Sequence, residues 1–285
     1  MNRVAVVTDS VASLPQEVVD KYNIHIIPVR LTIEGKVYRD TDEYLPPEVV
    51  HEFQKLSQID TTPWPPEFYF QEYEKLSQKA DNIVHVVCFS QFTSTISLAK
   101  AGAHMAREAM PHLKVEVFDS ATTTMAQGFI ALAAARAAAN GKGIDEVIKA
   151  ANAVKSKVNS IFAFDTLDYL ARTGRINKLA AWASSLLKVK PLVSLSQGEA
   201  HPLSLVRSRS QAIRNIVKAM RGSIESEEPL HVAIMDVECP HEAEELANIV
   251  KEQFQPAELY ITQFTPVMQI VAGPDILGVA FYYGE

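Results

Sequence analysis

A dense group of hydroxyl side chains follows an apolar run in the segment VVCFSQFTSTIS, residues 86–97. The hydroxyls belong to Ser90, Thr93, Ser94, Thr95 and Ser97. No carboxylate or histidine lies within the segment, so it offers neutral hydrogen-bonding groups and no strong general base. Such groups, placed before a helix, favour binding of a carboxylate or a phosphate. The segment therefore predicts a binding site for an anionic head group.

Two further serines occupy equivalent places in the sequence. Ser10 ends the run RVAVVTDS and Ser120 ends KVEVFDS, just as Ser90 ends IVHVVCFS. In an open α/β sheet, ligands bind at the carboxyl ends of the strands, where the next helix presents unpaired N–H groups. Serine and aspartate are also preferred helix N-caps, so TDS and FDS can simply start helices. Both interpretations stay open for Ser10 and Ser120.

An enzymatic role would need a base beside one of these hydroxyls. The sequence contains no GxGxxG, GxxxxGK[ST], GxSxG or HExxH motif. Ser94 or Ser120 would serve as the nucleophile of an acyl hydrolase or transferase only if a histidine folded against it. Of the nearby histidines, His85 is expected within a strand and His104 on a helix, where structural or solvated roles are more common. A serine-dependent enzyme remains an alternative to a binding protein.

The elements that position these residues alternate between strand and helix in the first part of the chain. Runs that are apolar on both faces, RVAVVTDS, IVHVVCFS and KVEVFDS, are typical of buried parallel strands. Helices are expected over residues 14–22, 94–110, 123–140 and 144–158. The alternation predicts an α/β domain with a parallel sheet over residues 1–158.

The second part of the chain shows more hairpin and fewer crossovers. A turn at Gln197-Gly198 joins two strand-like runs, and a similar turn is expected earlier, at Glu34-Gly35. Helical segments near residues 210–220 and up to residue 250 alternate with the strand-like LHVAIMDVE, ELYITQFTPV and GVAFYYGE. We expect a separate α+β domain with a mixed sheet over residues 159–285. The segment TTPWPPE, residues 61–67, is expected to be non-helical because it holds three prolines.

Composition restricts the class of partner. The chain has 285 residues, 47% hydrophobic and 21% charged, which is typical of a globular protein. A net charge of −7 gives no electrostatic reason to expect nucleic acid or an anionic membrane. Cys88 and Cys239 lie far apart without metal-ligand spacing, so no metal is expected. The sequence shows no signal-peptide pattern, and Arg136 interrupts its longest apolar run, so we expect no membrane span and a cytoplasmic location.

Several motifs together resemble the DegV family of bacterial fatty-acid-binding proteins along nearly the whole chain. They are VVTDS, the Thr61-Thr62 turn, FSQFTSTIS, DSATTTMAQG, DTLDYLARTGRI, KVKP, VRSRS and AGPDILGVAF. The resemblance implies two domains with a lipid tunnel between them. It implies a carrier that binds a long-chain fatty acid or a related lipid and presents its head group to a separate kinase. Such a carrier needs no catalytic residues and no cofactor besides the bound fatty acid.

The resemblance also assigns ligand-binding positions. The family's carboxylate-binding turn falls on Thr61 and Thr62, and its small-hydroxyl loop falls on Thr93, Ser94 and Thr95. Ser120, at the end of a strand-like run, is a further candidate, and the C-terminal turn contributes Val271 and Gly273. The candidate ligand-binding residues are Thr61, Thr62, Thr93, Ser94, Thr95, Ser120, Val271 and Gly273.

This chain departs from the family pattern near its end. The family commonly has a histidine that helps to hold the carboxylate where Val271 stands, ahead of a Gly-Pro-Gly turn that reads Gly273-Pro274-Asp275 here. Burying one methylene contributes about 0.8 kcal/mol, whereas one hydrogen bond to a charged group contributes roughly 1.5–3 kcal/mol. A long acyl chain therefore outweighs the missing donor. An acid at Asp275 would repel a carboxylate if it faced the site, which leaves a sensor for another amphiphile as a second alternative.

Basic residues near two of these motifs form a candidate partner surface. Arg175 matches the arginine of the family's GRI stretch, and Arg207 and Arg209 match its paired basic positions. Arginine is suited to docking a partner or to steadying a phosphate. Solvated charges and local salt bridges are an equally good explanation of the same residues.

Overall fold

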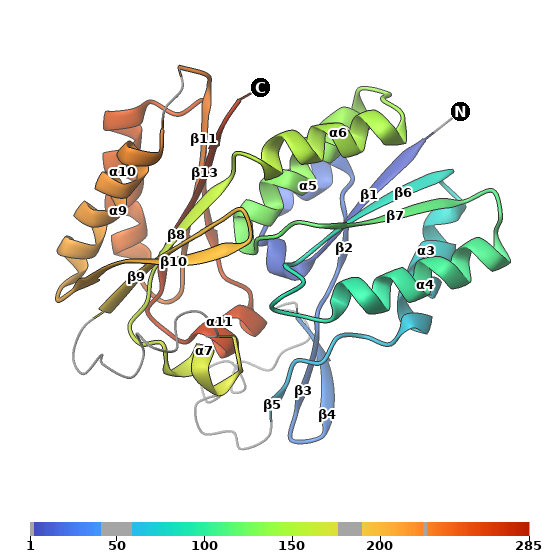
Figure 1. Cartoon of the computed structure of the whole chain (residues 1–285), viewed down its shortest axis with the longest axis horizontal. Coiled ribbons are helices and arrows are strands. Elements are labelled where there is room, and N and C mark those ends of the chain that lie inside the picture. The colour runs from blue at the N-terminus through green and yellow to red at the C-terminus, as the bar shows by residue number, and fades with distance from the viewer. Residues whose placement is uncertain (1–2, 41–58, 176–189, 225–226, 285) are drawn as a thin grey trace. The chain divides into compact units, whose positions relative to one another are not determined.

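The computed structural model describes residues 3–40, 59–175, 190–224 and 227–284. It divides into two compact units, Met1–Ser156 and Lys157–Glu285. The boundary expected from the sequence lies between residues 158 and 159. Each unit has its own central sheet (Figure 1). None of the helices in the described ranges combines the length and hydropathy of a membrane span.

The first unit is built on a four-stranded parallel sheet in the order β2-β1-β6-β7. Its strands are β1 (Val4–Asp9), β2 (His25–Ile27), β6 (Asn82–Val87) and β7 (Lys114–Asp119). Its helices are η1 (Ser10–Ala12), α1 (Gln16–Tyr22), α3 (Pro66–Ser77), α4 (Thr95–Ala109), α5 (Thr124–Ala139) and α6 (Ile144–Lys155). The predicted parallel-sheet domain is confirmed.

Alternate residues of the parallel strands face two different helical layers. Val7, Ile83 and Val117 pack on the side of α3 and α4, together with Tyr69 and Tyr73. The alanine-rich helix α5 packs against β1 and β6 on the other face. Its small side chains are buried almost all round, because both the sheet and α6 cover it. Burial on both faces explains why these strands read as continuous apolar runs.

A small antiparallel sheet, in the order β4-β3-β5, extends from the first unit. Its strands are β3 (Arg30–Ile33), β4 (Lys36–Arg39) and β5 (Ile59–Asp60). The turn between β3 and β4 is at Glu34 and Gly35, both at positive φ, as predicted.

The proline-rich segment was expected to be non-helical through Glu67, and that expectation is wrong at its end. Helix α3 begins at Pro66, so Pro66 and Glu67 are helical. A proline in the first turn loses no helical hydrogen bond, because the first N–H groups of a helix have no partner within it. Gly102 of α4 fits closely beneath this turn, since a Cβ there would lie 2.7 Å from the Pro66 carbonyl oxygen and 2.8 Å from Tyr69 Cβ.

The second unit has a six-stranded mixed sheet in the order β10-β9-β8-β13-β11-β12. Its strands are β8 (Asn159–Ala163), β9 (Lys190–Ser196), β10 (Glu199–Val206), β11 (Leu230–Asp236), β12 (Glu258–Gln263) and β13 (Leu277–Tyr283). Among these described strands, β11 and β12 pair in parallel, and the other neighbours are antiparallel. The predicted mixed sheet and the hairpin at Gln197-Gly198 are confirmed.

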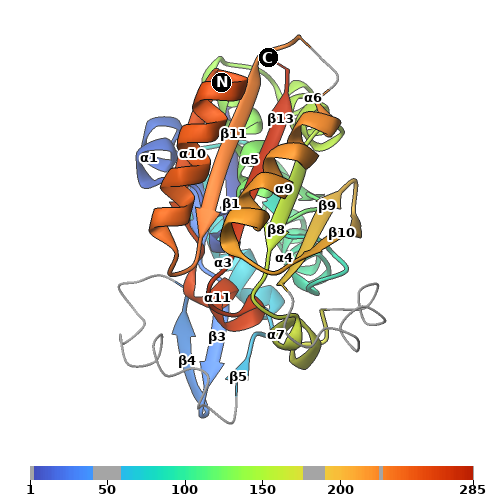
Figure 2. The ribbon, with the colours of Figure 1, turned by 90° about the vertical axis from the view of Figure 1, so that its left-hand side faces the viewer.

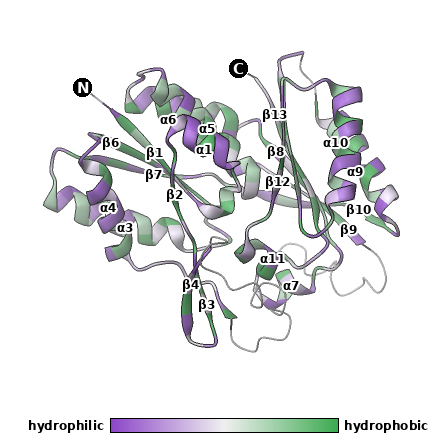
Figure 3. Ribbon diagram, turned by 180° about the vertical axis from the view of Figure 1, so that it is seen from behind, coloured by the Kyte–Doolittle hydropathy of each residue, from purple (hydrophilic) through white to green (hydrophobic). Residues whose placement is uncertain are grey.

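Two long helices cover one face of this sheet, α9 (Arg209–Ser223) and α10 (Pro240–Phe254). Figure 2 shows both in front of β8, β11 and β13. Their inward side chains, such as Ile213, Ile216 and Leu246, join one apolar core with the strands. Figure 3 shows purple and green stretches alternating along α10, as expected for an amphipathic helix.

Two short helices also belong to the described part of the second unit. They are α7 (Asp168–Arg172), which follows β8, and α11 (Pro266–Ala272), which precedes β13. The two helices contact each other, and Tyr169 of α7 packs against Gly273 at the end of α11. The segments KVKP and GRI lie partly outside the described residues, since 176–189 are not described.

Candidate ligand-binding site

The carboxyl ends of β1, β6 and β7 lie side by side, because β1 pairs with β6 and β6 with β7 in parallel. Asp9 ends β1, and its Oδ2 accepts a hydrogen bond from the backbone N of Cys88 at 3.0 Å. Asp119 ends β7, and its Oδ1 accepts from the backbone N of Ser90 at 3.3 Å and of Ala121 at 2.9 Å. The two acids therefore hold the loops that carry the hydroxyl groups.

Asp9 is an acid in an unusual environment. It is only 3% exposed, and burial raises its pKa to about 6. Hydrogen bonds from the backbone N of Cys88 and from Gln127 Nε2 lower the pKa, while the nearby Asp40 raises it, and burial prevails. Gln127 Nε2 of α5 lies 3.0 Å from Asp9 Oδ1. A buried carboxyl group that is costly to ionise therefore lies where the carboxyl ends of β1 and β6 adjoin.

The serines at the ends of β1 and β7 do not act as helix caps. TDS does begin the short helix η1, but no side-chain capping bond forms there. Ser10 Oγ instead donates to Asp40 Oδ2 at 2.6 Å and accepts from the backbone N of Val29 at 3.0 Å. Ser120 Oγ donates to the carbonyl of Thr122 at 2.9 Å, in a turn that precedes α5. The capping interpretation is wrong for both side chains, because each one ties a loop.

The hydroxyl loop between β6 and α4 has its own hydrogen bonds. Thr93 Oγ1 lies 2.8 Å from Thr95 Oγ1 and accepts from the backbone N of Thr95 at 3.2 Å. Ser94 is exposed at the N-cap position of α4, where its side chain makes no capping bond. Thr95 itself is buried. The structure therefore joins Thr93 and Thr95 through their hydroxyl groups.

The Thr61-Thr62 turn follows β5 and is anchored by Asp60. Asp60 Oδ1 accepts from the backbone N of Thr62 at 2.9 Å and from Thr62 Oγ1 at 2.5 Å. The Thr62 hydroxyl is the largest cause of a lowered pKa at Asp60. Thr61, just after the strand, is partly buried. The turn is thus preformed, and the proton of Thr62 points to Asp60.

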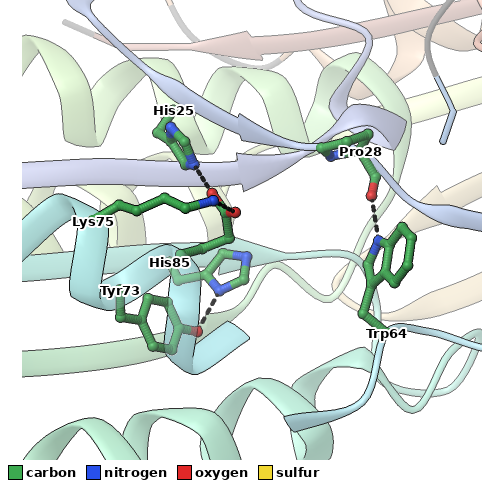
Figure 4. A network of polar contacts seen from close by, with 7 residues as sticks. His25, Pro28, Trp64, Tyr73, Lys75 and His85 are labelled. Atoms are coloured by element: carbon green, nitrogen blue, oxygen red, sulfur yellow. Dashed lines mark hydrogen bonds and ion pairs between the residues drawn. The ribbon is translucent and has the colours of Figure 1, made fainter. Parts of the chain in front are cut away.

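The residues after this turn are fixed by aromatic and polar contacts. Trp64 Nε1 donates to the carbonyl of Pro28 at 2.7 Å (Figure 4). The ring of Trp64 stacks on that of Phe68, with 4.3 Å between the centroids. One turn beyond Tyr69, Tyr73 Oη lies 2.7 Å from His85 Nδ1. Burial lowers the pKa of His85 to about 3, so this histidine stays neutral in the core.

Neither candidate nucleophile has a histidine partner among the described contacts. The side chain of Ser94 makes no capping bond, and the proton of Ser120 goes to a carbonyl. His85 lies within β6 and bonds Tyr73, and His104 is an exposed residue of α4 that contacts Arg107, as expected for structural or solvated histidines. In the described ranges, no group of three or more His, Cys, Asp or Glu side chains is placed to hold a metal ion.

The second unit places its candidate residues around the end of α11. Val271 is 6% exposed and lies in the last turn of the helix. Gly273 follows with φ 95° and ψ 178°, a conformation essentially restricted to glycine. Asp275 does not carry an isolated charge, because its Oδ1 lies 3.3 Å from Arg209 Nη2, which also donates to the Asp275 carbonyl. An apolar side chain thus occupies the position where the family resemblance led us to expect a histidine.

The basic residues differ in how firmly they are held. Arg209 is 19% exposed in its side chain and is tied to Asp275. Arg175 Nη1 donates to the carbonyl of Thr173 at 3.3 Å. Arg207 is exposed, and it is tied to α9 through its backbone N, which donates to Gln211 Oε1 at 3.0 Å. Of the three, Arg207 is the side chain best placed to reach a partner.

The chain matches a family model over residues 3–284, described as "uncharacterised protein, DegV family". The chain belongs to the DegV family. A DegV domain-containing protein of Streptomyces coelicolor is 31% identical over 278 residues, 97% of each chain. The solved structure of DegV from Bacillus subtilis, described as a fatty acid binding protein, is 27% identical with a TM-score of 0.86 over the whole of both chains. A DegV-family structure from Thermus thermophilus, 21% identical and covering 99% of this chain and 100% of its own, shares the fold with a TM-score of 0.90.

No motif in the sequence marks Tyr69, a buried residue of α3 that packs closely against Gly102 of α4. That packing is a tertiary feature. The signal available in the sequence is the spacing of Tyr69 and Tyr73, four residues apart after the proline turn. That spacing predicts one buried helical face but does not say what either side chain contacts.

Proposed function

We propose that this protein binds a long-chain fatty acid and holds its carboxylate through the hydroxyl loop of Thr93, Ser94 and Thr95. The observation that supports the proposal is the joined set of hydroxyl groups at the carboxyl end of the parallel sheet, which supplies neutral donors and no catalytic base. The fatty acid binding of the Bacillus subtilis relative supports the same ligand class. The bound lipid is then presented to a separate kinase, as the family resemblance implies.

The head group is held without the family's histidine in this proposal. Val271 contributes no hydrogen bond, and Asp275 is neutralised by Arg209 at 3.3 Å, so it adds little repulsion. A dozen methylenes at about 0.8 kcal/mol each outweigh one lost hydrogen bond of roughly 1.5–3 kcal/mol. We therefore favour a fatty acid over a lipid with a different head group.

The purified protein should carry lipid in a near-equimolar amount. A fatty acid that is buried along most of its length dissociates slowly, so it survives purification. Mass spectrometry of a denatured extract identifies chain length and head group in one measurement. After lipid removal, the protein should take up a fluorescent fatty acid with saturable stoichiometry. An extract without lipid, together with no uptake of the probe, would contradict the proposal.

Charge reversal at Arg207 should slow transfer of the bound fatty acid to a kinase. We expect Arg207→Glu to lower the rate of ATP-dependent acyl phosphate formation about tenfold, since an exposed charge mainly affects association. Affinity for the lipid and the melting temperature should not change. Arg214→Glu, at an exposed position on helix α9 just after Arg207, is the matched control. Equal rates for the wild type and Arg207→Glu with a competent kinase would remove Arg207 from the partner surface.

A further inference from the structure

Two arginines lie directly opposite each other on the small antiparallel sheet of the first unit. Arg30 of β3 pairs with Arg39 of β4, so both side chains leave the sheet on the same face. The alternate residues Leu31 and Ile33 point to the other face and are 0% and 3% exposed. Arg39 is exposed and Arg30 is partly buried. The sheet therefore buries one face and presents two guanidinium groups on the other.

This pair of positive charges has no partner that neutralises it. Neither guanidinium group of Arg30 and Arg39 forms an ion pair or a hydrogen bond with a residue in the described ranges. Like charges directly opposite each other on neighbouring strands destabilise a sheet. An anion bound between the two side chains would remove that repulsion, so the pair is a candidate binding site for an anion.

Aromatic contacts hold Arg39 near the Thr61-Thr62 turn. The Cζ of Arg39 lies 5.9 Å from the ring centroid of Phe68, in the first turn of α3. The Phe68 ring stacks on that of Trp64, the second residue after the Thr61-Thr62 turn. Trp64 in turn is tied to the carbonyl of Pro28, just ahead of β3 (Figure 4). The guanidinium of Arg39 therefore lies over the aromatic pair that follows the turn.

Strand pairing brings the same turn towards Arg30. Asp60 of β5 lies opposite Thr32 of β3, and the two strands are antiparallel, so the chain beyond Asp60 runs towards Arg30. The Thr62 hydroxyl lowers the pKa of Asp60 most, and the positive charge of Arg30 lowers it further. Asp60 shares the face of Arg30, but its Oδ1 already accepts from the backbone N and the hydroxyl of Thr62. The turn, one acid and two arginines thus form one polar surface.

The charge and spacing of the two arginines suit a phosphate better than a carboxylate. Directly opposite residues of antiparallel strands have Cα atoms about 4.5–5.5 Å apart, so two guanidinium groups can contact different oxygens of one ligand. A phosphate monoester offers three terminal oxygens and a charge of about −1.5 to −2 at pH 7. A carboxylate offers two oxygens and a single charge. Only the phosphate can neutralise both arginines.

We propose that Arg30 and Arg39 form a binding site, beside the Thr61-Thr62 turn, for a phosphate group at the end of a long acyl or alkyl chain. The inference rests on the proposed function, whose kinase step would place a phosphate on the head group of the bound lipid. It adds a second head group to the ligands of this protein and assigns two residues to it.

The test compares three ligands that share a chain and differ in the head group. They are hexadecyl phosphate, palmitate and hexadecanol, and their dissociation constants are measured by displacement of a fluorescent fatty acid, with melting temperatures recorded in parallel. We expect Arg30→Gln and Arg39→Gln each to weaken binding of hexadecyl phosphate about tenfold, because each removes a charge-assisted contact. Palmitate binding should weaken less than about threefold, and hexadecanol binding should not change.

Two further variants separate the site from general effects of charge and folding. Lys36→Gln removes an exposed positive charge from the same strand β4, but Lys36 pairs with Ile33 and so leaves by the other face. It should change no affinity by more than about twofold. Asp60→Asn keeps an oxygen for Thr62 and removes the negative charge, so it should tighten binding of hexadecyl phosphate about threefold. Damage to the fold cannot produce such a gain.

Arg39→Gln and Asp60→Asn alone decide the matter if Arg30→Gln lowers the melting temperature. An unchanged affinity for hexadecyl phosphate in Arg39→Gln, or equal losses for all three ligands, would overturn the site. A loss in Lys36→Gln as large as that in Arg39→Gln would also overturn it, since net charge would then explain the effect. A wild type that binds palmitate but not hexadecyl phosphate would refute this inference and leave fatty acid binding intact. A wild type that binds none of the three would instead refute the proposed function, and this inference with it.

Discussion

Replacing Gly273 by alanine should lower the free energy of unfolding of the second unit by about 3–5 kcal/mol. Two effects combine. Gly273 has φ 95° and ψ 178°, which strains any residue with a Cβ. In addition, the new Cβ would lie 2.5 Å from Tyr169 Cδ2, so the ring on α7 would have to move. Chemical denaturation followed by circular dichroism measures the change.

Two controls separate these contributions at Gly273. Gly174→Ala has a positive φ of 72° but no atom within 4 Å of the new Cβ, so it should cost only about 1 kcal/mol. The double variant Tyr169→Ala/Gly273→Ala removes the ring that clashes. It should therefore show a smaller additional effect of Gly273→Ala than the wild-type background does. A Gly273→Ala variant as stable as the wild type would mean that the turn relaxes freely.

Most strands and helices follow from patterns that a sequence displays directly. The runs that became β1, β6 and β7 are apolar on both faces, and the structure buries them between two helical layers. The hairpin turns at residues 34–35 and 197–198 were recognisable, because a glycine there accommodates positive φ. Helix α3 was missed because the prolines ahead of it dominate the local pattern, although a proline at the first position is compatible with a helix.

The candidate site was less accessible to sequence reasoning. The sequence shows where hydroxyl groups gather, but hydrogen-bond direction depends on tertiary neighbours. Thr62 donates to Asp60, and Ser120 donates to the Thr122 carbonyl. For Asp9, the deciding neighbours are Cys88 and Gln127, which are 79 and 118 residues away in the chain. No local pattern predicts such a contact, and the ligand-binding residues themselves stay predictions.

Replacing Asp9 by asparagine should stabilise the protein at neutral pH and change its response to acid. The pKa of Asp9 is raised from 3.8 to about 6 in the folded state. Between these values the folded protein binds more protons than the unfolded chain, so the free energy of unfolding falls as pH rises through this window. Two pKa units correspond to about 3 kcal/mol, all of it lost by pH 7. Asparagine does not ionise and suffers no such loss.

The local hydrogen bonds allow this substitution. The introduced asparagine keeps an oxygen for the backbone N–H of Cys88, and its amide would face Gln127, whose buried Oε1 has no hydrogen-bond partner among the described residues. A rotated Gln127 amide would then accept from the new side chain, and it would give up the bond that Gln127 Nε2 donates to Thr8 Oγ1 at 3.0 Å. The stability of the variant relative to wild type should therefore increase by about 2–3 kcal/mol between pH 4 and pH 7.5. Gln127→Met is the control, because it keeps Asp9 and removes a hydrogen bond that lowers the pKa of Asp9. The free energy of unfolding of this variant should therefore fall more steeply with rising pH than that of the wild type. If plots of the free energy of unfolding against pH stay parallel for the wild type and Asp9→Asn across this range, Asp9 does not titrate there.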